Sequence, residues 1–110
     1  MQLPPEIVQF IEDRAERIPS GELRQACEAL SAHYRGRGST AGLRLRPEAA
    51  AAAYLLMRFP ATYAAAHAAL AELKVRLGSV ELASCLDLGA GPGAASLAAR
   101  SVFPQLTQCT

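Results

Sequence analysis

The stretch Leu86-Asp87-Leu88-Gly89-Ala90-Gly91-Pro92-Gly93 decides the fold prediction. It places an acidic residue two positions before the first of three glycines at alternate positions. The apolar run 83–88 predicts a short strand, and the small residues 93–100 predict a helix. Because glycine adopts positive φ and carries no Cβ, a ligand can approach such a loop and the free N–H groups that begin the helix. The stretch therefore predicts the first strand, loop and helix of a doubly wound α/β sheet.

Asp87 is the first candidate ligand contact. It follows the carboxyl end of the predicted strand, where open α/β sheets bind ligands, and its carboxylate accepts hydrogen bonds from ammonium or hydroxyl groups. This pattern favours S-adenosylmethionine as the ligand, with Gly89, Gly91 and Gly93 shaping the loop.

Two other interpretations of the loop stay open. An NAD-type dinucleotide site is compatible with Gly89, Gly91 and Ala94 in the permissive form of the G-x-G-x-x-G/A pattern, although such a site has no use for Asp87. A structural turn with Asp87 as helix cap is the second alternative. A P-loop is excluded because no Lys-Ser/Thr pair follows the glycines.

The rest of the chain has the composition of packed helices. Its 110 residues are 51% hydrophobic and only 5% aromatic, which makes an all-β fold a poor match. A net charge of +1 gives no long-range electrostatic attraction to nucleic acid or anionic membranes. The longest apolar run, 49–57, is shorter than the roughly 20 residues of a membrane span. Three cysteines without metal-ligand spacing, in a chain lacking a secretory signal, predict a reducing cytoplasmic location and no metal site.

Apolar spacing predicts about four helices before residue 80. The first begins after Pro4 and Pro5, and Ser20 is expected to cap the second through its hydroxyl. Pro47 opens a third helix that is apolar all round and therefore expected to be largely buried. Thr62 is expected to cap a fourth that reaches about residue 77. Residues 1–80 thus form a helical region, and residues 81–110 form the start of a Rossmann-like domain.

The segment 36–46 is a glycine-rich loop with a local basic patch. The patch consists of Arg35, Arg37, Arg44 and Arg46, with no acidic residue among them. The patch is typical of a solvated loop, and the other interpretation is a salt-dependent contact with RNA, because arginine suits contacts to phosphate.

Several landmarks occur in one order along the chain. They are Leu3-Pro4-Pro5, Leu30-Ser31-Ala32-His33-Tyr34-Arg35, Ala53-Tyr54-Leu55, Arg58-Phe59-Pro60-Ala61-Thr62-Tyr63-Ala64-Ala65 and Leu86–Gly93. Together they resemble the methyltransferase-like proteins of the small ribosomal subunit, a family that includes mitochondrial small-subunit assembly factors and bacterial relatives. The resemblance spans Leu3 to about Arg100.

The resemblance implies the N-terminal part of a class I S-adenosylmethionine-dependent methyltransferase that acts on or near ribosomal RNA. The cofactor-binding residues it implies are Asp87, Gly89, Ala90, Gly91 and Gly93. It implies no catalytic base in this chain. Because most of the doubly wound sheet is expected to be missing, the unfinished sheet predicts self-association or a poorly ordered C-terminal third. A non-catalytic helical module that docks on the ribosome or an assembly partner is the alternative function.

Overall fold

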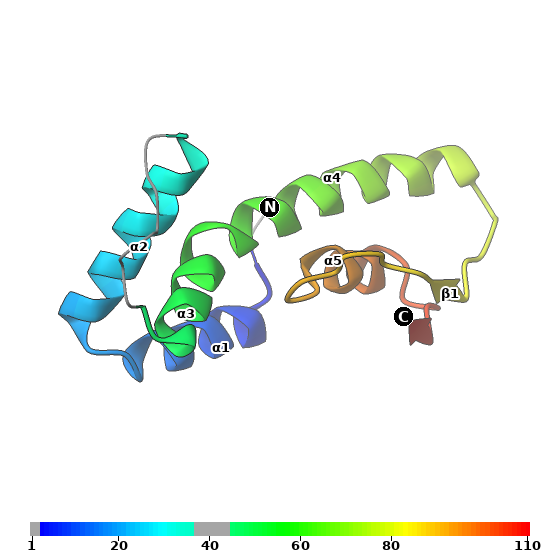
Figure 1. Ribbon diagram of the computed structural model, residues 1–110. Coiled ribbons are helices and arrows are strands. Elements are labelled where there is room, and N and C mark those ends of the chain that lie inside the picture. Colours follow the sequence, from blue (N-terminus) through cyan, green and yellow to red (C-terminus); the bar gives the residue numbers. More distant parts are fainter. Residues whose placement is uncertain (1–2, 37–44) are drawn as a thin grey trace. The chain divides into compact units, whose positions relative to one another are not determined.

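The computed structural model describes residues 3–36 and 45–110, which form five helices and two short strands (Figure 1). In chain order these are α1 (Pro5–Glu16), α2 (Ser20–Tyr34), α3 (Pro47–Met57), α4 (Phe59–Leu77), β1 (Ser84–Cys85), α5 (Ala94–Val102) and β2 (Gln108–Cys109). The predictions of a mainly helical chain and of four helices before residue 80 are confirmed. Among these five helices, none combines the length and the hydrophobicity needed to cross a membrane.

The chain divides into two compact units, one formed by Pro4–Arg58 and one built on Phe59–Thr110. The predicted boundary near residue 80 separates helices from the strand that follows. The compact units divide earlier, because α4 packs along α5 and so belongs with the strands.

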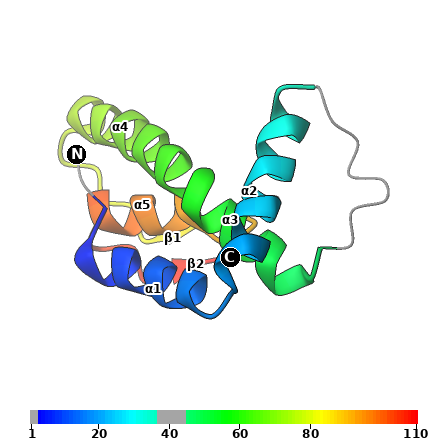
Figure 2. The ribbon, with the colours of Figure 1, turned by 90° about the vertical axis from the view of Figure 1, so that its left-hand side faces the viewer.

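Alanine side chains form most of the core of the unit Pro4–Arg58. Helix α3 packs against both α1 and α2 (Figure 2). The buried residues of this core are Ile18, Ala26, Ala49, Ala52 and Ala53. Because the side chains at the contact set the distance between helix axes, alanine lets these helices approach closely.

The third helix is less buried than its composition predicts. Only one stripe of α3 reaches the core, while Leu56 and Met57 near its end are 38% and 39% exposed. The expectation of a largely buried helix is wrong, because α1 and α2 cover only part of its surface.

Prolines, and not hydroxyl caps, mark the starts of α1 to α4. Ser20 is the first residue of α2 and makes no capping hydrogen bond, because Pro19 holds the cap position. Helix α4 begins at Phe59, with Pro60 in its first turn, so Thr62 lies inside the helix. Proline fits the first turn of a helix because its φ is already helical. The N–H that proline lacks would have no hydrogen-bond partner in that turn. The predicted Ser20 and Thr62 caps are therefore wrong.

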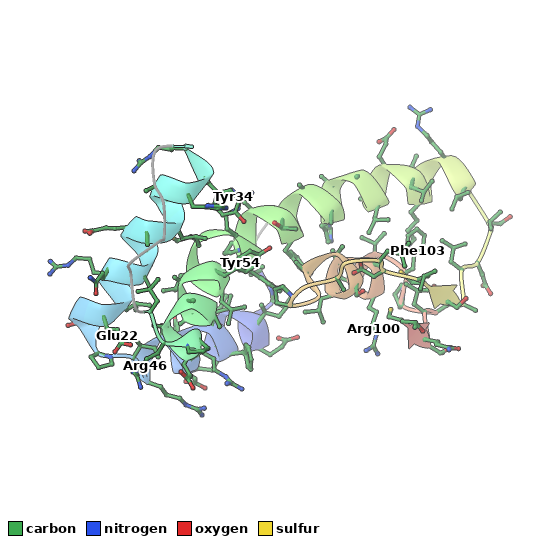
Figure 3. All side chains as sticks on the ribbon, viewed as in Figure 1. Glu22, Tyr34, Arg46, Tyr54, Arg100 and Phe103 are labelled. Carbon is green, nitrogen blue, oxygen red and sulfur yellow. The ribbon has the colours of Figure 1, made fainter. Side chains whose placement is uncertain are left out.

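A bidentate ion pair joins the starts of α2 and α3. Arg46, which immediately precedes α3, donates from Nε to Glu22 Oε1 at 2.6 Å and from Nη2 to Oε2 at 3.0 Å (Figure 3). The hydrogen bond and charge of Arg46 lower the pKa of Glu22 from its ordinary value.

In the unit Phe59–Thr110, α5 connects two parallel strands and packs against α4. Ser84 pairs with Gln108 and Cys85 with Cys109. The expected strand within 106–110 is confirmed, whereas the strand expected over 83–88 is two residues long. A Rossmann-like fold is more than this single β-α-β unit, and the described residues carry no further strand.

A mixed aliphatic and aromatic core holds α5 in place. Its buried members are Ala99, Val102, Phe103 and Leu106. Lys74, in the last turn of α4, donates from Nζ to the carbonyl of Val102 at 2.9 Å. This bond satisfies a carbonyl at the end of α5 that has no partner within its helix.

The alanine core gives a stability test. Ala52 on α3 is 3% exposed, so Ala52→Leu would add three carbons to a packed contact and lower the free energy of unfolding by about 1–3 kcal/mol. Ala51→Leu on the same helix is the matched control, because Ala51 is exposed. Urea unfolding measures the free energy of unfolding of both variants. An equal value for Ala52→Leu and Ala51→Leu would contradict this packing.

The Glu22–Arg46 pair gives a pH test. Because the folded pKa of Glu22 is lowered, the pair stabilises fully above the ordinary glutamate pKa and is lost as pH falls through the lowered value. Side-chain NMR titration should show the lowered pKa in the wild type and its return toward the ordinary value in Arg46→Gln. An unchanged Glu22 pKa in that variant would contradict the pairing.

Candidate functional site

The predicted ligand loop lies between the end of β1 and the start of α5. Backbone pairing of the two strands continues past their ends, because Thr110 donates to the carbonyl of Cys85 at 2.9 Å and Asp87 donates to that of Thr110 at 2.6 Å. Since both strands run in the same direction, their carboxyl ends meet at one edge. Asp87 and the loop are therefore held at that edge, where ligands bind in open α/β folds.

All three loop glycines adopt the conformation that favours glycine. Gly89, Gly91 and Gly93 have φ values of 67°, 56° and 87°. A Cβ added at any of them would meet no other heavy atom within 4 Å. The loop therefore needs glycine for its backbone shape, while the space beside it is open to a ligand.

The carboxylate of Asp87 is anchored on one side only. Its Oδ2 accepts a hydrogen bond from Ser96 Oγ at 2.7 Å, and both residues are half-buried. The described residues provide no hydrogen bond to the other oxygen, Oδ1. One carboxylate oxygen thus positions the side chain, and the other can accept a hydrogen bond from a ligand.

The first turn of α5 has no side-chain cap. Gly93 holds the cap position, and Leu97 donates to its carbonyl at 2.9 Å. Asp87 reaches Ser96 through the hydroxyl and does not cap the helix backbone. The alternative of Asp87 as a helix cap is therefore wrong, and the start of α5 offers N–H groups beside the open side of the loop.

The structure divides the predicted site residues into two groups. Asp87 and Gly93 are half-buried beside α5, whereas Gly89, Ala90 and Gly91 form the exposed tip of the loop. The carbonyl of Ala90 accepts from the N–H of Gly93 at 3.0 Å, which folds the tip back toward the helix.

Ser96, which orients Asp87, is a site residue that the sequence patterns did not predict. A serine in the first turn of an alanine-rich helix was the available signal, because serine competes for local hydrogen bonds and has little intrinsic preference for helix interiors. The contact itself depends on how α5 folds back on the loop, which no local pattern gives. In the described part of the chain, no group of three His, Cys, Asp or Glu side chains is placed to hold a metal ion.

The basic patch is only partly described. Arg35 is exposed at the end of α2, and Arg46 is paired with Glu22. Arg37 and Arg44 lie outside the described residues. Arg46 is therefore not available to the patch as an unpaired cation, because Glu22, which lies 24 positions earlier in the sequence, binds it.

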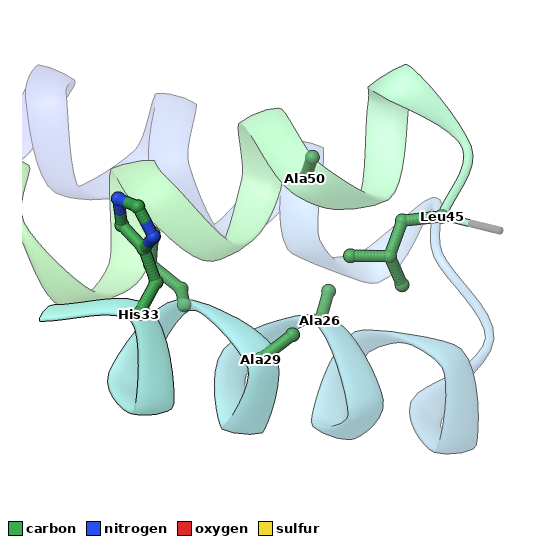
Figure 4. A pocket seen from close by; sticks show the side chains of 6 residues that line it. Ala26, Ala29, His33, Leu45 and Ala50 are labelled. Carbon is green, nitrogen blue, oxygen red and sulfur yellow. The ribbon is translucent and has the colours of Figure 1, made fainter. Parts of the chain in front are cut away.

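A shallow hollow of about 230 Å³ opens between α2 and α3 (Figure 4). Its lining is Ala26, Ala29, Leu30, His33, Leu45 and Ala50. Ligand sites are usually larger and combine apolar walls with several convergent polar groups, whereas His33 is the one ionisable side chain in this lining. The loop at β1 and α5 is therefore the better candidate site.

The Ser96 contact can be tested by deletion of its hydroxyl. Ser96→Ala removes the donor to Asp87 and should lower the free energy of unfolding by about 1 kcal/mol. The exposed Ser101 on the same helix makes no side-chain hydrogen bond in the described structure, so Ser101→Ala is the control. Chemical unfolding measures both, and an equal effect of the two changes would refute the anchoring role of Ser96.

Comparison with known proteins assigns the family. No curated protein and no solved structure matches the chain. The family model described as "Mitochondrial small ribosomal subunit Rsm22" matches residues 48–110, more than half of the chain. The match covers α4, both strands, the glycine loop and α5. The chain therefore belongs to the mitochondrial small ribosomal subunit Rsm22 family.

Proposed function

We propose that the loop Asp87–Gly93 binds S-adenosylmethionine and that the chain is the N-terminal part of a methyltransferase-like protein acting at the small ribosomal subunit. One observation carries this proposal. Ser96 holds one oxygen of the Asp87 carboxylate, and the space beside the neighbouring glycine loop is open. Membership of a small-ribosomal-subunit family supports the partner.

The chemistry of the loop suits the charged parts of this ligand. Asp87 Oδ1 can accept a hydrogen bond from an ammonium or hydroxyl group while Ser96 holds Oδ2. The uncapped start of α5 favours negative charge, such as a carboxylate. When bound, S-adenosylmethionine supplies an already activated methyl group, so the protein has mainly to bind and orient.

A dinucleotide is less well matched to the same loop. The pattern of Gly89, Gly91 and Ala94 fits it, and Ala94 is buried at the start of α5 as close helix packing requires. However, a dinucleotide site leaves the Ser96-oriented carboxylate of Asp87 without a ligand group to bind. NAD is therefore the competitor to include in the binding test.

Docking without catalysis is a second candidate function, favoured by exposed apolar side chains next to the loop. Leu86 and Leu88 are 67% and 82% exposed on the segment that leads into it. Two exposed leucines, two positions apart, form an apolar surface that a protein partner can cover. On this hypothesis the chain binds the small subunit or an assembly partner, with Arg35 adding a phosphate contact.

Two substitutions test ligand binding at the loop. Gly91→Ala puts a Cβ into the open space and should weaken S-adenosylmethionine binding at least about tenfold. Asp87→Asn keeps an oxygen that can accept from Ser96 but removes the charge, so it should weaken binding while preserving the fold. Isothermal titration calorimetry of the purified chain with S-adenosylmethionine, and separately with NAD, is the measurement.

Gly78→Ala is the matched control for the glycine change. Gly78 has φ 63° and equally open surroundings, so backbone strain is similar but the residue lies outside the loop. Binding should be unchanged in this variant. Absence of S-adenosylmethionine binding by the wild type, together with co-sedimentation with small subunits that Gly91→Ala leaves intact, would favour docking and overturn the methyltransferase proposal.

A further inference from the structure

Two cysteines from distant parts of the sequence face each other across the parallel strands. Cys85 on β1 is the register partner of Cys109 on β2. Register partners in a parallel pair project to the same side of the sheet. Neighbouring strands lie about 4.8 Å apart, which is within the Cα separations that a disulfide bridges.

The two thiols have similar surroundings, and both are partly accessible to solvent. Both are free and half-buried, and both pack against the cluster formed by Ala99, Val102, Phe103 and Leu106. The third cysteine, Cys27, is also free and half-buried, but it packs in the unit Pro4–Arg58. Cys27 therefore provides a thiol of similar exposure without a cysteine opposite.

Cys109 affects the pKa of the Cys85 thiol. Burial raises the pKa of Cys85, and the charge and hydrogen bond of Cys109 raise it further, with a smaller effect from Asp87. Burial alone raises the pKa of Cys27. The thiol form of Cys85 thus prevails at neutral pH, and its reaction with oxidants becomes faster as pH rises.

We propose that Cys85 and Cys109 form a thiol-modification site, a dithiol that a small-molecule disulfide such as glutathione disulfide oxidises to an intramolecular disulfide. The site is independent of the ligand proposal for the loop. It assigns a chemical use to two residues that the loop chemistry leaves unexplained.

The reaction balances with glutathione disulfide as the oxidant. One cysteine loses its proton to solvent and attacks a glutathione sulfur, which forms a mixed disulfide and releases one glutathione thiolate. The other cysteine, likewise deprotonated, then attacks the protein sulfur of that mixed disulfide and releases the second glutathione. The two protein thiols are oxidised to one disulfide, and one glutathione disulfide is reduced to two glutathione thiols.

The bond would lock the strand edge that carries the candidate site. Cys85 and Cys109 close a segment that contains the whole loop and α5. The carbonyl of Cys85 accepts from Thr110, whose own carbonyl accepts from Asp87. Because each strand is only two residues long, a covalent link at this pair should suppress opening of both hydrogen bonds.

Incubation of the full chain with glutathione disulfide tests the proposal. Intact mass under non-reducing conditions should show a monomer lighter by two hydrogen atoms, with peptides containing Cys85 and Cys109 linked and Cys27 still alkylatable. Cys85→Ser and Cys109→Ser should each abolish this product, while Cys27→Ser should retain it. Dithiothreitol should restore the original mass.

Amide hydrogen exchange supplies a second readout. Oxidation should slow exchange of the Asp87 and Thr110 amides about tenfold or more, with no change within α2. A stable mixed disulfide with glutathione, a dimer linked between chains, or unreacted thiols would each overturn the proposal. Loss of the product in Cys27→Ser would overturn it as well.

Discussion

Parallel pairing of β1 with β2 is the constraint on which the candidate site depends. It brings residue 87 next to residue 110 and sets the carboxyl ends of both strands at one edge. The glycine loop and the start of α5 can only lie at that same edge, because α5 must return the chain to the opposite end of the sheet before β2 begins. The hydrogen bond from Ser96 to Asp87 then orients an acidic side chain at this edge.

Each compact unit brings its own core to the structure. The unit Pro4–Arg58 has a core of alanine contacts between α2 and α3, and the exposed ion pair between Glu22 and Arg46 joins the starts of these two helices. The unit Phe59–Thr110 relies on larger side chains beneath α5 and on the contact from Lys74 to the end of that helix. The candidate site lies wholly within the second unit, and the family match covers all of its segment Phe59–Thr110.

Local sequence patterns predicted the helices and strands well, and the tertiary contacts between them poorly. Proline positions, helical spacing and the strand-loop-helix stretch predicted four helices, the glycine loop and a second strand, all of which the structure contains. Helix starts were wrong where a proline and a hydroxyl competed, as at Ser20, because Pro19 takes the cap position and Ser20 becomes the first helical residue. The sequence could not predict pairs such as Glu22 with Arg46, since these residues are 24 positions apart and meet only after the helices pack.

The central claim is that the loop Asp87–Gly93 is a binding site for S-adenosylmethionine. An NMR titration of the ¹⁵N-labelled chain tests it most directly, because each backbone amide reports its own surroundings. The amide signals of Gly89, Gly91 and the first turn of α5 should shift in a saturable manner, while those of α1 and α2 stay in place. Unmoved loop signals at saturating ligand, or shifts confined to α1 and α2, would contradict the claim.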